Sequence, residues 1–140
     1  MKNKIRKIEE GDSYVLEKTI TEDMVNSFAK LSGDYNPVHM DEKYCRGHGI
    51  NGRIVHGMLL LSFLSTFLGM HFPGEGTLWL SNHIDFISPA KIGDSIRIKG
   101  TVTDRNTSNV LGLDILEIKI SISNQLNKVL ARGKVKVCIK

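Results

Sequence analysis

The run from Gly57 to Gly69 is the strongest constraint on what this chain can fold into, because it is apolar on nearly every side. A membrane-spanning helix needs about 20 apolar residues, and this run is shorter and contains Ser62, Ser65 and Thr66. A helix that is hydrophobic all round is usually buried within protein. The run therefore predicts a central helix that the rest of the chain must cover, and no association with a membrane.

Apolar residues alternate with polar ones along much of the remaining chain, as is typical of strands. The alternating segments are 14–20, 78–86, 96–102, 111–122 and 129–139. In the second of them, one face is expected to carry Leu78, Leu80, Ile84 and Phe86. In the fourth, the alternation changes phase after Ile115, which predicts a bulge or a bend. At least five strands and one very apolar helix predict an α+β fold, in which an antiparallel sheet curls around the long apolar central helix.

A second helix is expected between the first strand and the central helix. Thr21 is a typical N-cap, and Gly33 lies where a left-handed residue would end the helix. In the segment that follows, Pro37 pushes Asn36 into an extended conformation, so an extended loop is expected over 34–39. A short helical turn over 41–45 then leads into a glycine-rich loop.

The composition is that of a soluble globular protein, with 140 residues of which 41% are hydrophobic and 24% charged. We expect one domain over residues 1–140. The two cysteines, Cys45 and Cys138, fit no disulfide framework, and the basic start over 2–7 runs into acidic residues rather than an apolar leader. These features predict a reducing, cytoplasmic setting.

The net charge of +4 slightly favours anionic partners, but it does not single out nucleic acid. Near the end of the chain, basic residues alternate with apolar ones, as on the solvated face of a strand. Only 6% of the residues are aromatic, and no recognition-helix pattern is present. Nucleic-acid binding is therefore not expected.

Asp34 and His39 are the first candidates for chemistry, because they lie five residues apart on a proline-stiffened segment. At neutral pH such a pair offers an ionised carboxylate and a mostly neutral imidazole, which together can polarise one water. The alternative is structural: Asp34 hydrogen-bonds the backbone of an Asx turn, and His39 fills a gap. The residues alone leave both interpretations open.

Gly57 is the second candidate, at the head of the central helix and directly after His56. Backbone N–H groups in a first helical turn have no intrahelical partner, and they lie at the positive end of the helix dipole. They can therefore hold an oxyanion, and a residue without Cβ lets a ligand carbonyl approach closely. The structural alternative is that glycine only eases a tight entry into the helix.

Together, an acid–base pair and a backbone amide are the parts required to add water across an α,β-unsaturated thioester. Attack at C3 places negative charge on the thioester oxygen, and a fixed donor at that oxygen is typically worth about 3–4 kcal/mol of barrier. The pair activates the water and returns a proton to C2, an effect of about 100-fold or more. Neither part needs a metal.

Two motifs in this order carry a family resemblance: 31–39, Leu-Ser-Gly-Asp-Tyr-Asn-Pro-Val-His, and 55–59, Val-His-Gly-Met-Leu. With the Phe-Pro-Gly turn at 72–74 and the strand-rich second half, the chain resembles the MaoC-like, or hydratase-2, family of (R)-specific enoyl-CoA hydratases. The resemblance implies a hot-dog fold and an active site at or near the interface of a homodimer or higher homo-oligomer.

The resemblance also implies roles for individual residues. Asp34 and His39 are expected to be the catalytic pair, and Gly57 the oxyanion donor through its backbone N–H. Asn36 is expected to shape the catalytic loop, and Ser62 to orient the pair from the helix. Because a serine in a buried helix can instead bond a carbonyl of its own helix, the role of Ser62 stays open.

Cys45 is where the sequence departs from the family pattern, which usually has Ala or Ser six positions after the histidine. A small side chain is kept, and a buried reduced cysteine is expected rather than a nucleophile. Cys45, His48 and His56 match no zinc spacing, so no metal site is predicted. No cofactor is expected, since coenzyme A would be part of the substrate.

The leading hypothesis is therefore an enzyme, a hydro-lyase that reversibly hydrates a trans-2-enoyl-CoA to an (R)-3-hydroxyacyl-CoA. One alternative is a 3-hydroxyacyl-[acyl-carrier-protein] dehydratase, which uses the same residues with a different carrier. A second is a hot-dog domain that binds acyl-CoA without transforming it. A thioesterase, which would release free CoA thiol, is expected less.

Overall fold

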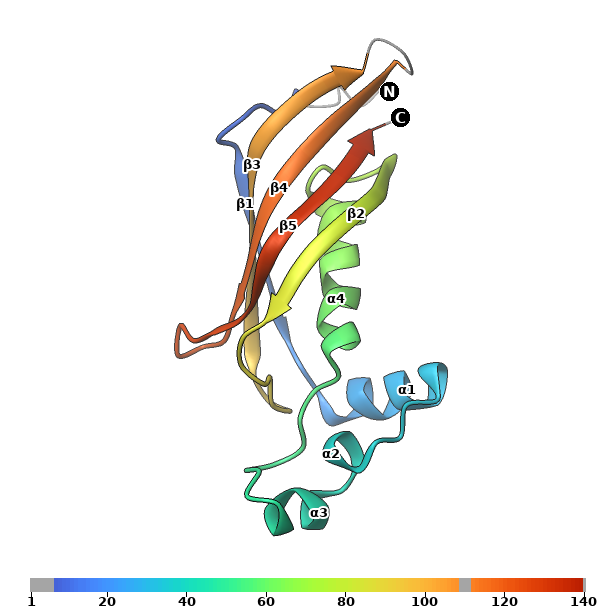
Figure 1. Ribbon diagram of the computed structural model, residues 1–140, viewed down its shortest axis with the longest axis vertical. Coiled ribbons are helices and arrows are strands. Elements are labelled where there is room, and N and C mark those ends of the chain that lie inside the picture. The colour runs from blue at the N-terminus through green and yellow to red at the C-terminus, as the bar shows by residue number, and fades with distance from the viewer. Residues whose placement is uncertain (1–6, 109–111, 140) are drawn as a thin grey trace.

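The apolar run forms α4, Gly57–Thr66, in the computed structural model, which describes residues 7–108 and 112–139. The helix continues as a π-helical turn, η1, Phe67–His71. Its buried side chains are Leu59, Leu60, Leu61 and Leu64. Met58, Ser62, Ser65 and Thr66 are exposed, however, so the expectation of a helix buried on nearly every side is wrong for the single chain. The reason is that one sheet covers one side of the helix (Figure 1).

The sheet has five antiparallel strands in the order β1-β3-β4-β5-β2, so β1 and β2 are its edges. The strands are β1 (Ser13–Thr19), β2 (Thr77–Phe86), β3 (Ser95–Ser108), β4 (Leu113–Ser123) and β5 (Val129–Ile139). The sheet curves around α4 as predicted (Figure 1). Alternate residues of β4 and β5 are buried against the helix, and they form most of the core with α4 and η1.

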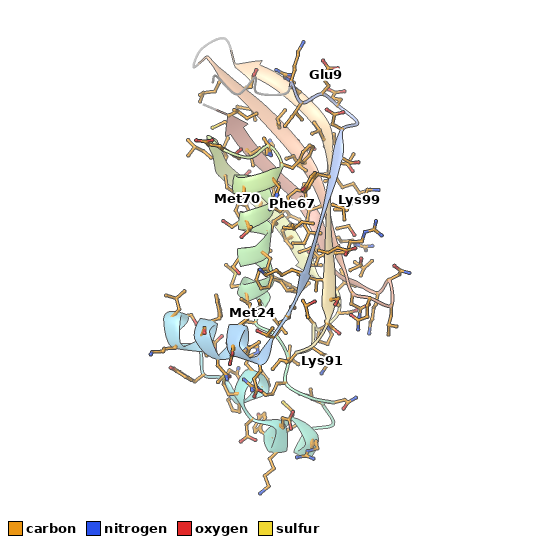
Figure 2. All side chains as sticks on the ribbon, turned by 180° about the vertical axis from the view of Figure 1, so that it is seen from behind. Glu9, Met24, Phe67, Met70, Lys91 and Lys99 are labelled. Carbon is orange, nitrogen blue, oxygen red and sulfur yellow. The ribbon has the colours of Figure 1, made fainter. Side chains whose placement is uncertain are left out.

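Close contact between the helix and the sheet depends on a glycine in β3. A Cβ at Gly100 would come within 2.7 Å of the ring of Phe67 and within 3.1 Å of Ile118. Figure 2 shows Phe67 on the side of the helix that faces the sheet. Gly100 therefore leaves the space that this aromatic ring fills.

Two irregularities lie elsewhere than the alternation predicts. The register of β4 with β5 is unbroken from Asp114 to Ile122, so the bulge expected near Ile115 is wrong in place. The shift lies in β3, between Val102 and Asp104. The sequence alternates in two phases because both faces of this strand carry apolar residues. Ile115, which pairs with Cys138, lies on one face, and Leu116, the next residue, lies on the face that packs against the helix. Leu111, the first residue of this expected pattern, lies outside the described residues.

The second irregularity is a bulge in β2 between Trp79 and Ser81. One extra residue reverses which face each later side chain points to. Leu78, which pairs with Cys138, therefore lies on the opposite face from Ile84, which pairs with Gly133. The expectation that Leu78, Ile84 and Phe86 share one face is wrong for this reason.

Three helices lie at the end of the sheet where α4 begins: α1 (Glu22–Ser32), α2 (Pro37–Met40) and α3 (Glu42–Gly47) (Figure 1). The predicted caps of α1 are confirmed: Thr21 Oγ1 accepts the Met24 N–H at 3.2 Å, and Gly33 is left-handed with φ of 80°. Within the described residues, no helix is long and apolar enough to cross a bilayer.

The extended loop expected over 34–39 is wrong from Pro37 onward, because Pro37–Met40 form a helical turn. Asn36 is extended as predicted, with φ of −52° and ψ of 129°, and it is the N-cap of this turn. Proline fits the first helical position, where its missing N–H is not needed and its fixed φ suits the helix. His39 thus lies on α2 rather than on a loop.

Candidate active site

The structure brings Asp34 and His39 together at the N-terminal end of α4. His39 Nε2 lies 3.8 Å from Asp34 Oδ2, and the side chains are 14% and 51% exposed. His39 Nδ1 lies 2.7 Å from the Ile54 carbonyl oxygen, and because that oxygen can only accept, Nδ1 carries a proton. In the neutral ring, Nε2 therefore carries a lone pair, and this lone pair faces the carboxylate.

The two carboxylate oxygens of Asp34 have different partners, so the Asx turn and the pairing with His39 are both present. Oδ1 accepts the Asn36 N–H at 3.1 Å, which is the Asx turn of the structural alternative. Oδ2 is the oxygen that faces His39. Asn36 in turn accepts the Val38 N–H at 3.2 Å and so starts the helix that carries His39. This local network fixes the distance between the two titratable groups.

His56 is a third member of the site, which the sequence interpretation did not select. Its side chain is 2% exposed, and Nε2 donates to the Asp34 carbonyl oxygen at 3.0 Å. Its ring stacks on that of His39, with 3.9 Å between the ring centroids, and it contacts the edge of Phe28. His56 therefore contacts both members of the pair. Its position directly before Gly57 was the available signal.

Gly57 is the first residue of α4, so its N–H belongs to the turn that lacks intrahelical acceptors. Within the described residues no acceptor bonds this N–H, whereas the His56 carbonyl accepts from Leu59 and Leu60. A Cβ at position 57 would come within 2.9 Å of the Phe86 ring. The structure thus gives a reason for glycine that the sequence did not: the end of β2 packs against it.

Ser62 lies on α4 but is not joined to the pair. Its hydroxyl donates to the Leu59 carbonyl oxygen at 2.6 Å, which is a bond within its own helix. Cys45 is buried and free, as predicted, and its Sγ lies 3.3 Å from the Val38 carbonyl oxygen. The thiol therefore packs beneath α2.

Arg53 is a buried cation that the sequence interpretation missed. Its side chain is 8% exposed, and its Nε donates to the carbonyl oxygen of His39. One terminal nitrogen lies 2.9 Å from Glu22 Oε1, and the other lies 2.6 Å from Asn26 Oδ1. Nothing in the local pattern pointed to Arg53, because its partners lie 14, 27 and 31 residues away.

Asp34, His39 and His56 each have a possible metal-ligating atom within 4.8 Å of the others. The geometry does not suit an ion, however. The two imidazoles stack with only 27° between their planes, so their in-plane lone pairs do not converge. His39 Nδ1 and His56 Nε2 are also occupied by carbonyl oxygens. Cys45 and His48, which the sequence offered as possible ligands beside His56, likewise bond main-chain carbonyls.

A hollow of about 530 Å³ lies on the face of the sheet away from α4, and no residue of the pair lines it. Its basic residues are Lys99, Lys119, Arg132 and Lys134. Lys99 points away from the helix (Figure 2). Lys134 Nζ lies 3.3 Å from Glu117 Oε1, and this hydrogen bond lowers the pKa of the Glu117 carboxyl. The hollow is therefore separate from the site that Asp34 and His39 form.

Comparisons with known proteins agree with this fold. A model of the family described as MaoC like domain matches residues 5–113. An (R)-specific enoyl-CoA hydratase from Rhodospirillum rubrum is 38% identical over an alignment of 120 positions, and the alignment covers 79% of this chain and 83% of the relative. A mitochondrial 3-hydroxyacyl-[acyl-carrier-protein] dehydratase from Arabidopsis thaliana is 35% identical over 86 residues, 61% of this chain and 51% of that protein.

Among solved structures, an (R)-hydratase from A. caviae involved in PHA biosynthesis superposes with a TM-score of 0.88 at 30% identity. The match covers 96% of this chain and 99% of that structure. The chain therefore belongs to the MaoC-like family, and the predicted hot-dog, α+β fold is confirmed. The prediction of a hydro-lyase is confirmed at the level of enzyme class, since the named relatives are hydratases and dehydratases.

Proposed function

We propose that this protein reversibly hydrates trans-2-enoyl-CoA thioesters to (R)-3-hydroxyacyl-CoA. The observation that carries the proposal is the 3.8 Å separation of His39 Nε2 and Asp34 Oδ2. With Nδ1 protonated, both facing atoms are acceptors, so they cannot bond each other in the neutral state of the ring. A water between them can donate one hydrogen to each, as in many polar contacts longer than about 3.5 Å.

In the hydration direction, the water oxygen bonds to C3 while one of its protons passes to the pair. The C2=C3 electrons move toward the thioester, and negative charge develops on its oxygen. The Gly57 N–H, at the positive end of α4, stabilises that charge. Return of a proton to C2 completes the addition, so the elements of one water are gained and no cofactor or metal is needed.

Direct substitution tests the proposed pair. Asp34→Asn and His39→Ala should each lower the rate of crotonyl-CoA hydration by about 100-fold or more, because each removes part of the acid–base pair. The loss of enoyl absorbance measures the rate, and circular dichroism checks the fold. Parental rates in both variants would show that the assigned roles are wrong.

His83 and Asp85 offer a matched control. They form an exposed His–Asp pair on β2, also with 3.8 Å between Nε2 and a carboxylate oxygen. His83→Ala and Asp85→Asn change the same residue types without touching the proposed site, so they should keep the parental rate. Binding of crotonyl-CoA without turnover by the parent would favour the non-catalytic alternative, and release of CoA thiol would favour a thioesterase.

The alternative carrier is acyl carrier protein, and the relative from Arabidopsis thaliana carries that specificity in its name. Asp34, His39 and Gly57 would act in the same way on either thioester. Comparing kcat/KM for crotonyl-CoA with that for the crotonyl thioester of the carrier protein separates the two candidates. We expect the CoA thioester to be the better substrate.

We also propose that the protein acts as a homodimer, because the central helix (α4 with η1) and the edge strand β2 with the residue after it expose apolar side chains. These exposed residues are Met58, Met70, Leu80, Phe86 and Ile87. Apolar side chains exposed on a helix and on a strand beside it favour an interaction site, and an edge strand offers unpaired backbone groups to a second copy. We retain a cytoplasmic setting as an expectation, which the two free, buried cysteines support.

A further inference from the structure

We propose that Arg53 is a positioning residue for His39, and this inference depends on the proposed function. Arg53 does not reach the reacting atoms, because its side chain is buried and its donors are taken up by protein groups. Its Nε donates to the backbone carbonyl of the residue whose imidazole faces Asp34. The inference is that this bond sets where the imidazole lies.

The helix that carries His39 needs such support. Pro37–Met40 is a single turn, and isolated helices of fewer than about 12 residues are marginal in water. The position of α2 therefore depends on contacts with the rest of the chain. Arg53 joins α2 to α1, since the same guanidinium that bonds the His39 carbonyl also bonds Glu22 and Asn26 of α1.

The residues after Arg53 hold the remaining parts of the site. The Ile54 N–H donates to the Val38 carbonyl at 2.9 Å, and the Ile54 carbonyl accepts from His39 Nδ1 at 2.7 Å. His56 Nε2 donates to the Asp34 carbonyl. Gly57 follows directly. The continuous segment 53–57 thus holds both members of the pair and carries the proposed oxyanion donor, so a shift of Arg53 would change their mutual geometry.

Lysine could not replace arginine at this position without loss. A guanidinium presents its donors in a fixed plane, and here that plane serves three acceptors on two helices. An ammonium is a point donor on a flexible stem. The substitution Arg53→Lys would keep the charge opposite Glu22, but the new side chain could not also hold the His39 carbonyl in the same geometry.

The test compares Arg53→Gln and Arg53→Lys with Glu22→Gln and Asn26→Ala. The last two are matched controls: Glu22→Gln removes the negative charge opposite Arg53 but keeps an acceptor oxygen, and Asn26→Ala removes one bond to α1. Each leaves the other link to α1 and the bond to His39 intact. We expect Arg53→Gln to lower kcat by about 10–100-fold, since small misplacement of a reacting group has effects of this size. KM should stay within about threefold, because Arg53 makes no substrate contact.

Arg53→Lys should give an intermediate kcat, whereas Glu22→Gln and Asn26→Ala should stay within about twofold of the parent even where they lower the melting temperature. The inference is overturned when Arg53→Gln or Arg53→Lys, folded by circular dichroism, has the same kcat as Glu22→Gln. Should Arg53→Gln fail to fold, the lysine variant decides the outcome in the same way.

A second measurement does not depend on activity. The imidazole nitrogens of His39 report the tautomer by 15N NMR, with the His39→Ala spectrum giving the assignment. The parent and Glu22→Gln should show the form with the proton on Nδ1, bonded to Ile54, and Arg53→Gln should show a mixture. An unchanged spectrum in Arg53→Gln would overturn the inference. An inactive parent that gives the expected spectra would instead contradict only the proposed function.

Discussion

At the scale of single residues, the contact between Gly57 and Phe86 links the start of α4 to the end of β2. A Cβ at position 57 would lie only 2.9 Å from the nearest ring atom of Phe86, which is too close for an ordinary contact. Glycine is thus fixed here by packing, and the same packing determines how the proposed oxyanion donor sits relative to the sheet. A substitution at 57 would therefore disturb an edge strand as well as a backbone amide.

Gly57→Ala should lower the free energy of unfolding by at most about 1 kcal/mol, the low end of the cost of adding volume to a packed contact, because the Phe86 ring is 51% exposed and can turn aside. It should also lower hydration of crotonyl-CoA, because the added methyl group lies beside the proposed oxyanion donor. Urea denaturation and initial rates measure the two effects. In the Phe86→Leu background the stability cost of Gly57→Ala should shrink, since the branched side chain lacks the ring atoms that clash. An equal cost in both backgrounds would contradict this explanation.

The candidate site was predictable from the sequence only where its signals are local. Asp34, Asn36 and His39 lie in one short motif, and the structure joins them by bonds over two residues and by the 3.8 Å contact. His56 and Arg53 act through bonds that span 22 and 14 residues. No periodicity or cap in one sequence encodes such pairings, so their roles emerged only from the fold.

At the scale of elements, the packing of η1 on β3 determines how closely the helix approaches the sheet. Gly100 supplies the space and Phe67 fills it. Gly69, on the same π-helical turn, provides a contrast, because nothing lies within 4 Å of the Cβ that a substitution there would add.

Gly100→Ala should therefore destabilise the protein by about 1–3 kcal/mol through overpacking. Gly69→Ala should be neutral or should stabilise it by about 0.5–1 kcal/mol, since alanine restricts the unfolded chain more than glycine does. Thermal and urea unfolding measure both. If the two variants were equally stable, the contact between the Phe67 ring and β3 would not limit packing.

Most elements were predictable because caps, turns and alternation depend on residues that are close in the sequence, as Thr21, Gly33 and the 129–139 strand show. The β2 bulge was not predictable, because the sequence spacing of Leu78 and Ile84 is the same in a regular strand and in a bulged one. The helical turn at Pro37 was missed because proline both ends helices and begins them. Only the neighbouring elements distinguish the two cases.

At the scale of the whole molecule, the exposed side of α4 and the β2 edge predict a second copy. Leu80→Glu places a charge on that edge strand, where the parental side chain is 51% exposed. The charge would have to be buried without a partner in the dimer, so the variant should be monomeric by light scattering after gel filtration. Leu126→Glu is the control, because Leu126 is 78% exposed in the turn between β4 and β5. A monomeric parent would contradict the proposed dimer.

The supports of the Asp34–His39 pair have a consequence for how this sequence can diverge. His56 bonds the main chain of residue 34, Arg53 bonds that of residue 39, and the His39 ring bonds that of residue 54. Every amino acid supplies a peptide oxygen. Position 54 can therefore take any side chain except proline, which would lose the N–H that bonds Val38, provided that the path of the chain is kept. The geometry of the reacting groups is then inherited unaltered.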